Sequence, residues 1–336
     1  MRTTVDGAGP RVGGRESARG VPWRELAARH GALVVLLLVV AVAGASLDGF
    51  LAPGNLNRIA VSASFLAVIA LGMTFVIITG GIDLSVGTVF ALGGVLAAWA
   101  SRYGELALMA VPLAVCGLIG LLNGVLIARA RLAPFITTLA TMLGAWGLML
   151  SVSDEGNTTY LVADGLALSA LVHGKLFGVL GYPFLLVVAV FVMGGLVLRR
   201  TTVGQHVYAV GGNERTAALM GVPVARTRIA VYTFSGLCAG TAGALNAVWL
   251  GSGVTIFGIG TELQAISAVV IGGTLLTGGY GFVGSTLVGV LLLGVIQNVI
   301  NAVGSLTSAF QEVVSGLFLI TVVLVQRRLS RGRDPG

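Results

Sequence analysis

The chain has 336 residues, of which 56% are hydrophobic and only 10% are charged, against about 25% charged residues in a typical soluble protein. So few charges cannot cover a soluble surface, and the 51 glycines match the enrichment found in packed transmembrane helices. Lys175 is the only lysine among the 20 basic residues, and Leu176 follows it, so the sequence has no Gly-Lys-Ser/Thr loop for nucleotide phosphates. Composition therefore predicts an all-α, polytopic integral membrane protein that does not hydrolyse ATP itself.

The first 30 residues form an Arg- and Gly-rich tail, which we expect to be cytosolic and partly disordered. The first apolar stretch follows at 31–49. A secretory signal peptide is the alternative for this stretch, because Ala43-Gly44-Ala45 resembles a cleavage site. The charged region before it is about twice as long as that of a signal peptide, which favours a retained membrane span.

Ten stretches are long enough to cross a bilayer, with allowance for short or broken ones, and they predict about ten transmembrane helices within a membrane domain at 31–328. In chain order they are 31–49, 59–79, 87–101, 107–128, 134–152, 182–198, 229–250, 262–277, 282–302 and 309–326. A basic cytosolic tail at 329–336 follows them. With the N-terminus in the cytosol, every basic residue except Arg58, Arg102 and Lys175 falls on the inner side, as the positive-inside rule expects. We therefore predict that both termini are cytosolic, and we interpret the basic charge as a topology signal and not as nucleic-acid binding.

Two hydrophilic connections are long enough to hold structure of their own. The outer one, at 153–181, is acidic and contains a weakly amphipathic stretch at 166–171. The inner one, at 199–228, is the longest cytosolic connection. It combines helix-forming residues with capping residues, so we expect a short helix within it.

This short inner helix is predicted to span about two turns. Asn213 is a favourable N-cap, Glu214 faces the helix dipole, and Gly221 and Pro223 prevent the helix from continuing. An apolar side is expected from Ala217, Leu219 and Met220. Two interpretations remain open: an interfacial loop, or a rigid element that docks into a cytosolic partner.

A glycine-rich string occurs twice in the chain. Residues 80–87 read GGIDLSVG and residues 272–279 read GGTLLTGG, and both are expected at the inner end of a span. Duplicated spans are common in transporters. Within the first string, Asp83 is the only acid near membrane depth on the inner side, and Ser85 follows two residues later. We expect Asp83 to cap the next helix, or to act as a gate or substrate residue; the two roles are compatible.

The other polar side chains in the predicted spans are uncharged, which suits a neutral polyhydroxylated solute better than an ion or a phosphorylated metabolite. The simpler interpretation of each is a hydrogen bond between helices, worth about 0.6–2 kcal/mol. Glycines four residues apart, at 120 and 124 and at 236 and 240, predict helix-packing seams. The candidate residues for a translocation pathway or gate are Asp83, Ser85, Asn123, Thr138, Trp146, Asn246, Gln264, Gln297 and Asn298.

The sequence holds no recognisable metal site or catalytic constellation. Cys116 and Cys238 both lie inside apolar runs, and the three histidines are far apart with no metal-ligand spacing. We therefore expect no metal, no cofactor bound by this chain, and no enzymatic activity.

Four strings together resemble the ribose-type permeases of bacterial ABC sugar importers, within the branched-chain amino acid/ribose superfamily. They are Gly80–Gly87, Pro134–Leu139, Val210–Val222 and Glu262–Thr274, and the resemblance covers about residues 31–328. Three further strings look closest to the second permease of galactofuranose-type systems: Ser151–Ser153, Gly304–Ser308 and Gln326–Arg327.

The resemblance implies a multi-pass permease subunit of the bacterial plasma (inner) membrane, which moves a neutral pentose or hexose inward by alternating access. It also implies three partners: an ATPase subunit that binds ATP and Mg²⁺, a second permease that is identical or homologous, and an extracytoplasmic sugar-binding protein. Coupling to the ATPase would use Asn213, Glu214, Arg215, Ala217, Ala218, Leu219, Met220 and Gly221.

Two other classes of membrane protein are the alternatives. An ion-coupled secondary transporter with broken helices would need carboxylates at mid-membrane depth, and the chain has almost none. A purely structural membrane scaffold is disfavoured by the many amides in the predicted spans.

Overall fold

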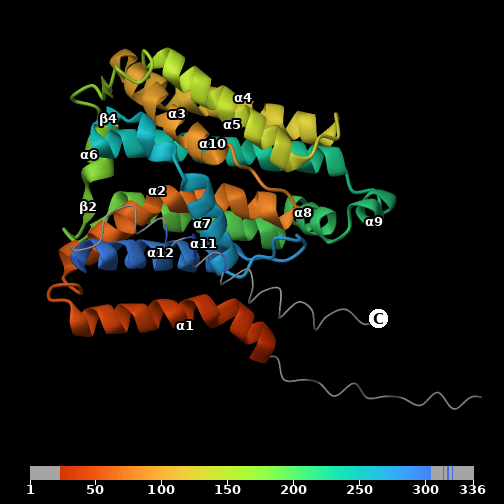
Figure 1. Ribbon diagram of the computed structural model, residues 1–336, viewed down its shortest axis with the longest axis horizontal. Coiled ribbons are helices and arrows are strands. Elements are labelled where there is room, and N and C mark those ends of the chain that lie inside the picture. Colours follow the sequence, from red (N-terminus) through yellow and green to blue (C-terminus); the bar gives the residue numbers. More distant parts are fainter. Residues whose placement is uncertain (1–22, 304–312, 314–315, 318–319, 321–336) are drawn as a thin grey trace, which may run out of the picture.

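The computed structural model describes residues 23–303 together with 313, 316–317 and 320, and this part of the chain is a bundle of long helices that lie side by side (Figure 1). The long helices are α1 (Trp23–Ser46), α2 (Pro53–Ile78), α3 (Val86–Ala100), α4 (Glu105–Ala128), α5 (Pro134–Val152), α7 (Tyr182–Arg200), α10 (Val224–Leu250) and α12 (Val283–Val303). Prolines in the first turn begin α2, α5 and α7, where the missing N–H costs no hydrogen bond.

The remaining elements are short. They are the helices α6 (Ala167–His173), α8 (Thr202–Gly212), α9 (Glu214–Leu219) and α11 (Thr261–Ile271), the 3₁₀ turns Ser101–Tyr103 and Thr255–Gly258, and four two-residue strands. Strand β1 (Tyr160–Leu161) pairs with β4 (Ser252–Gly253), and β2 (Lys175–Leu176) pairs with β3 (Leu180–Gly181), both antiparallel. Helices α8 and α9 lie at one end of the bundle, here called the α9 end, and α6 and the strands lie at the opposite end, here called the α6 end (Figure 1).

Within the described residues, five helices are long and apolar enough to cross a membrane: α2, α4, α5, α7 and α12. Helix α1 contains a shorter apolar segment at Gly31–Ser46, and it begins at Trp23, eight residues before the predicted span. The tenth predicted stretch, 309–326, and most of both tails lie outside the described residues. The structure thus supports a polytopic helical membrane protein, and the number ten stays a prediction.

The predicted stretch at 262–277 is a short one, of the kind for which the prediction allowed. Helix α11 ends at Ile271 after 11 residues, about 16 Å of helix, which is about half the thickness of the bilayer core. Gly272 and Gly273 follow it, and Gly273 has a φ of +90°, a conformation that a helix cannot contain. The glycines at the start of the second repeated string therefore end this helix after about half the thickness of the bilayer core.

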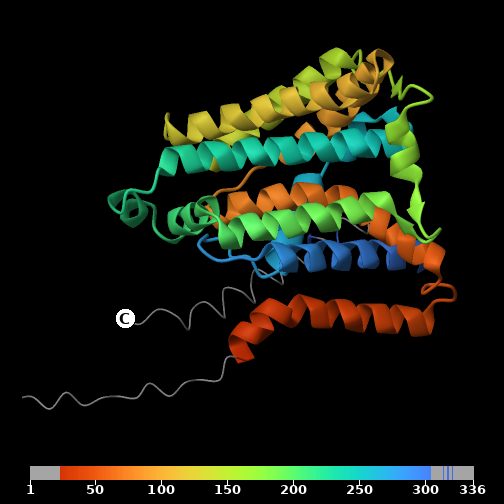
Figure 2. The same cartoon turned by 180° about the vertical axis from the view of Figure 1, so that it is seen from behind.

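Helix α10 lies at the centre of the bundle and packs against α2, α3 and α4. Glycines let α4 and α10 approach closely, as predicted. A Cβ atom on Gly124 would lie 2.7 Å from the Cα of Ile229, and one on Gly240 would lie 2.7 Å from the Cβ of Cys116. Figures 1 and 2 show α4 and α5 on one flank of the bundle and α1 on the other, with α10, α2 and α12 between them.

The outer surface of the bundle is apolar. On α5, the side chains of Phe135, Ile136 and Leu143 are more than half exposed. An exposed apolar surface of this kind is stable against lipid tails and unstable in water. The lipid bilayer predicted as a partner of this chain therefore fits the surface that the helices present.

Candidate functional site

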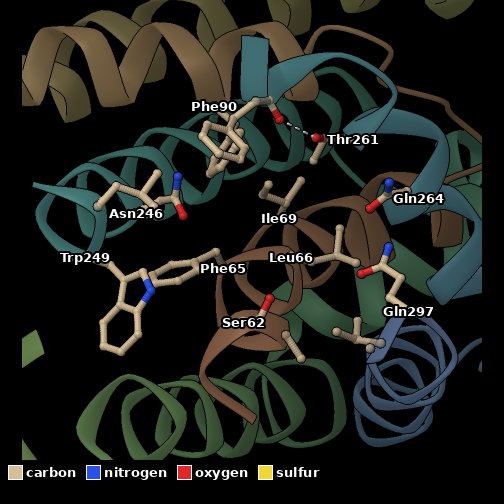
Figure 3. A pocket seen from close by; sticks show the side chains of 15 residues that line it. Ser62, Phe65, Leu66, Ile69, Phe90, Asn246, Trp249, Thr261, Gln264 and Gln297 are labelled. Carbon is tan, nitrogen blue, oxygen red and sulfur yellow. Dashed lines mark hydrogen bonds between the residues drawn. The ribbon is translucent and has the colours of Figure 1, made fainter. Parts of the chain in front are cut away.

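A cavity of about 250 Å³ lies among α2, α10, α11 and α12 (Figure 3), and we call it the polar cavity. Three of the predicted pathway residues meet there from three different helices: Asn246 from α10, Gln264 from α11 and Gln297 from α12. Its lining is completed by Ser62, Ala63, Phe65, Leu66, Ile69, Phe90, Trp249, Leu250, Phe257, Thr261, Val290 and Gly294. None of these lining residues is charged.

The amides and the aromatic rings face the polar cavity from different sides. Figure 3 shows Gln264 and Gln297 together on one side, and Trp249 beside Phe65 on the other. Among the described residues, the side-chain amides of Asn246 and Gln297 have no hydrogen-bond partner. An unpaired amide offers one acceptor and two donors, so the cavity can exchange hydrogen bonds in both directions with a bound hydroxyl-rich molecule.

Trp249 and Phe65 are residues of this cavity that the sequence reasoning missed. Trp249 lies three positions after Asn246 on α10, and residues three apart share a helix face. Helical spacing from Asn246 would have found it. No comparable signal existed for Phe65, since it reaches the cavity from α2, nearly two hundred residues earlier in the chain.

Asp83 lies in a separate polar cluster, and its side chain is only 1% exposed. One carboxylate oxygen, Oδ1, accepts hydrogen bonds from the Ser85 backbone N–H at 3.0 Å and from the Ser85 hydroxyl at 2.6 Å. The other, Oδ2, accepts one from the Ser235 hydroxyl at 3.0 Å. Ser235 is the twelfth residue of α10, so the carboxylate lies within the bundle and not at its surface. Asp83 thus fixes the turn that precedes α3 and ties this turn to α10.

Two more helices join this cluster through Asn123 and Thr138. The Asn123 amide donates to the Ser85 hydroxyl at 3.0 Å and accepts from the Thr141 hydroxyl at 2.7 Å. The Thr138 hydroxyl accepts from the Leu84 backbone N–H at 3.1 Å. Four of the predicted residues, Asp83, Ser85, Asn123 and Thr138, therefore form one buried network that links α3, α4, α5 and α10.

The structure separates Trp146 and Asn298 from both groups. Trp146 lies on α5, half-buried against the hydrophobic core, and lines neither cluster nor cavity. Asn298 exchanges two hydrogen bonds with the Asn55 amide, at 3.0 and 3.1 Å, so it joins α12 to the start of α2. Asn298 therefore forms hydrogen bonds between helices, which was the simpler of the two interpretations of the polar residues in the spans.

The predicted short inner helix is present as α9. Asn213 is its N-cap and accepts a hydrogen bond from the Thr216 backbone N–H at 2.9 Å. After the helix, Gly221 has a φ of +83°, and Glu214 forms an ion pair with Arg228 at 2.7 Å. Local capping chemistry alone was sufficient to place this helix.

The apolar residues of α9 do not form the single side that the sequence predicted. Ala217 is buried, whereas Leu219 is 89% exposed and Met220 is 80% exposed. The difference arises because residues two positions apart on a helix do not share a face, so the face that buries Ala217 turns Leu219 away from the bundle. Arg215 and Ala218 are exposed beside them. The α9 end therefore presents a short, rigid projection with two large apolar side chains at its tip.

The two repeated glycine strings touch each other at the α9 end. Gly279 donates its backbone N–H to the Ile78 carbonyl at 2.9 Å, and a Cβ atom on Gly278 would lie 2.8 Å from the backbone nitrogen of Gly80. Gly211 of α8 packs against the same place, since its Cβ atom would lie 2.6 Å from the Gly279 nitrogen. We call Gly80, Gly211, Gly278 and Gly279 the glycine junction. It places α8, the helix before α9, directly against both strings.

Comparison with known proteins identifies the family to which the chain belongs. Residues 55–323 match the family described as "Branched-chain amino acid transport system / permease component". The ribose import permease protein RbsC of Bacillus subtilis (strain 168) is 37% identical over 300 residues, which cover 89% of this chain and 91% of that protein. The inner membrane ABC transporter permease protein YjfF of Escherichia coli (strain K12) is 40% identical, over 84% of this chain and 86% of that protein.

A third relative is the L-arabinose ABC transporter permease protein AraH of Azospirillum brasilense, which is 34% identical over 94% of this chain and 92% of that protein. No solved structure matches the chain. The relatives align over nearly their whole length, as the four motif strings led us to expect. This protein belongs to the family of branched-chain amino acid transport system permease components.

Proposed function

We propose that this chain is the membrane-spanning permease subunit of an ABC importer for a neutral monosaccharide, and that the polar cavity is part of the path of the sugar. The observation that carries the proposal is the convergence of Asn246, Gln264 and Gln297 on one uncharged cavity that also contains Trp249. Amides bind sugar hydroxyls as donors and acceptors, and the flat apolar face of an indole suits the C–H faces of a sugar ring.

The relatives support the same class of substrate. Ribose and L-arabinose are named for RbsC and AraH, and both are small neutral sugars that match an uncharged cavity of about 250 Å³. An ion or a phosphorylated metabolite would call for a basic residue in the lining, and there is none among its described residues. Galactofuranose, suggested by the finer resemblance, stays a prediction.

Three partners complete the proposed transporter. An ATPase subunit, which binds ATP and Mg²⁺, contacts the α9 end through Leu219 and Met220. A sugar-binding protein delivers the sugar at the α6 end. A second permease, identical or homologous, lies beside this chain in the membrane. The α9 end and both termini are cytosolic in this arrangement. ATP binding then favours one arrangement of the permeases and hydrolysis restores the other, which gives alternating access.

An ion-coupled secondary transporter is the competing class. Membership of the permease family disfavours it, because YjfF and AraH are named as ABC transporter permeases. The hydrogen bonds of Asp83 favour the same conclusion. Both of its carboxylate oxygens already accept hydrogen bonds from serines, as expected for a residue that holds local structure.

The test is transport by the complete system. The chain, its ATPase, its sugar-binding protein and, where the second permease is a different chain, that permease are reconstituted in proteoliposomes. ATP-dependent uptake of radiolabelled neutral sugars, with ribose and L-arabinose first, is then measured. We expect uptake of at least one sugar, reduced about fivefold to thirtyfold by Asn246→Ala or Gln297→Ala, the range that loss of one or two hydrogen bonds gives. Gln205→Ala is the matched control, since this exposed amide of α8 is far from the cavity. Absence of uptake of every neutral pentose and hexose, galactofuranose included, would contradict the substrate class, and wild-type uptake by both cavity variants would contradict the proposed path.

A further inference from the structure

A second cavity, of about 590 Å³, lies at the α6 end and shares a wall with the polar cavity. We call it the loop cavity, because most of its lining comes from the connections near α6. Arg102, Asp164, Ser169 and His173 contribute polar groups to it, so this cavity, unlike the polar cavity, has one basic and one acidic side chain in its lining. Trp249 and Leu250 line both cavities. Trp249 thus borders both a cavity near the loops and a cavity among the membrane helices.

His173 holds the Trp249 side chain in this position. The imidazole ring stacks on the indole, with 5.1 Å between ring centroids and 15° between ring planes. Its two nitrogens contact backbone carbonyls on either side: Nε2 lies 3.3 Å from the Trp249 oxygen, and Nδ1 lies 2.9 Å from the Ser169 oxygen. His173 therefore contacts the wall residue through its ring face and its ring edge together.

The helix that carries His173 is fastened to the bundle at both ends. At its start, the Glu105 carboxylate accepts hydrogen bonds from the backbone N–H groups of Ala167 and Leu168, the latter at 3.3 Å. Near its end, Val172 is buried in the hydrophobic core. Any displacement of the 153–181 connection that moves α6 must therefore move His173 relative to Trp249.

We propose that the loop cavity is a second subsite for the same neutral sugar, and that the Trp249 indole, held by His173, is the partition that the sugar passes to reach the polar cavity. The inference rests on the proposed function, which supplies the sugar and the direction of travel. The chemistry of the loop cavity suits the same ligand as that of the polar cavity. The Asp164 carboxylate can accept hydrogen bonds from two sugar hydroxyls, the Ser169 hydroxyl can donate and accept, and the Arg102 guanidinium can donate.

The partition is tested by cysteine labelling, which needs no sugar. Cys116 and Cys238 are both buried, so a maleimide that cannot cross the membrane reports an introduced cysteine. Asn246→Cys places the probe in the polar cavity. In the assembled transporter, we expect its labelling from the α6 side to accelerate about threefold to tenfold with His173→Ala or Trp249→Ala, the range for loss of one aromatic pair and its hydrogen bond.

Two controls make this result specific. Trp146→Ala removes an indole that lines neither cavity and should leave the labelling rate unchanged. His173→Phe keeps the stacked ring and should label more slowly than His173→Ala. Equal labelling of Asn246→Cys in the His173→Ala, Trp249→Ala and unaltered backgrounds would overturn the partition. Because His173 is exposed, its variants test the partition even where Trp249→Ala does not fold.

The subsite is tested by protection from the same reagent. Ser169→Cys places a cysteine in the loop cavity and leaves intact the backbone carbonyl that contacts His173. Ribose or L-arabinose, delivered by the binding protein, should slow its labelling at least about threefold and leave Asn157→Cys, in the neighbouring loop, unaffected. Protection of Asn246→Cys without protection of Ser169→Cys would overturn the subsite and leave the proposed function standing. Protection of neither would count against both.

Discussion

The backbone N–H of Gly279 donates a hydrogen bond of 2.9 Å to the carbonyl of Ile78, the last residue of α2. This bond joins the second glycine string to the end of α2, two residues before the first string, and Gly211 of α8 packs against both bonded residues. Helix α9 follows α8 after the single residue Asn213. We therefore expect movement of α9 to reach the end of α2 through these close backbone contacts.

Replacement of Gly211 should uncouple α9 from the membrane helices. In Gly211→Ala the new methyl group would overlap the carbonyl oxygen of Ile78 and lie 2.6 Å from the Gly279 nitrogen, and such overpacking costs at least about 1–3 kcal/mol. We expect uptake in the reconstituted transporter to fall at least about tenfold, the equivalent of 1.4 kcal/mol. Gly212→Ala is the matched control, because nothing lies within 4 Å of its Cβ position. Equal uptake by the two variants would show that the glycine junction does not transmit motion.

The exposed tip of α9 should bind the ATPase. Leu219→Asp and Met220→Asp place a charge on side chains that are 89% and 80% exposed, so the permease itself should keep its stability. We expect co-purification of the ATPase subunit and sugar uptake to be lost together. Leu161→Asp, at the α6 end and 74% exposed, is the control that should leave ATPase binding intact. Retention of the ATPase by both tip variants would refute the proposed docking.

Asp83 should contribute to stability through its acceptor oxygens. Asp83→Ala leaves the Ser85 N–H and the Ser235 hydroxyl unsatisfied in a buried site, which costs about 1–3 kcal/mol for each such group. In Asp83→Asn, the amide oxygen can still accept from Ser85, and the Ser235 hydroxyl can turn to accept from the amide nitrogen. We expect the thermal unfolding temperature in detergent to fall clearly for the Ala variant and little for the Asn variant.

A transport measurement on the same two variants separates the roles proposed for Asp83. If its charge is part of the gate, Asp83→Asn keeps its stability and loses uptake; wild-type uptake by this variant would assign Asp83 to helix capping alone. Equal unfolding temperatures for the Ala variant and the unaltered protein would contradict the hydrogen-bonding role itself.

Topology can be measured with the two buried cysteines left in place. A single cysteine at Asn157, in the connection near α6, should react with an impermeant reagent added outside the cell. One at Thr216, in α9, should react only after the reagent is given access to the cytosol. The positive-inside distribution of arginine predicts this orientation. Reversed reactivity would place the α9 end outside and would remove the proposed ATPase contact.

The sequence by itself determined the features that depend on neighbouring residues. Long apolar runs specified the membrane helices, and Asn213 with Gly221 specified α9, because hydrophobicity and capping act within a few residues. The end of α11 before Gly272 is also a local feature, because the adjacent glycines that end this helix can be seen in the sequence. The apolar stretch extends beyond this point, but Gly273 has a positive φ that ends the helix, whereas the glycines inside α4 and α10 keep helical backbone.

Only the tertiary structure decided which polar residues act together. Asn246 and Gln297 face one cavity with no hydrogen-bond partner in the described part of the chain, whereas Asn298 is paired with Asn55. The same amide chemistry thus has different consequences, because the rotation of each helix and its choice of neighbour depend on packing across the whole bundle. Likewise, Trp249 and not Trp146 reaches the polar cavity, and the stack with His173 joins residues 76 positions apart. Contacts over such separations are set by how the helices assemble, and no local pattern in the chain encodes them.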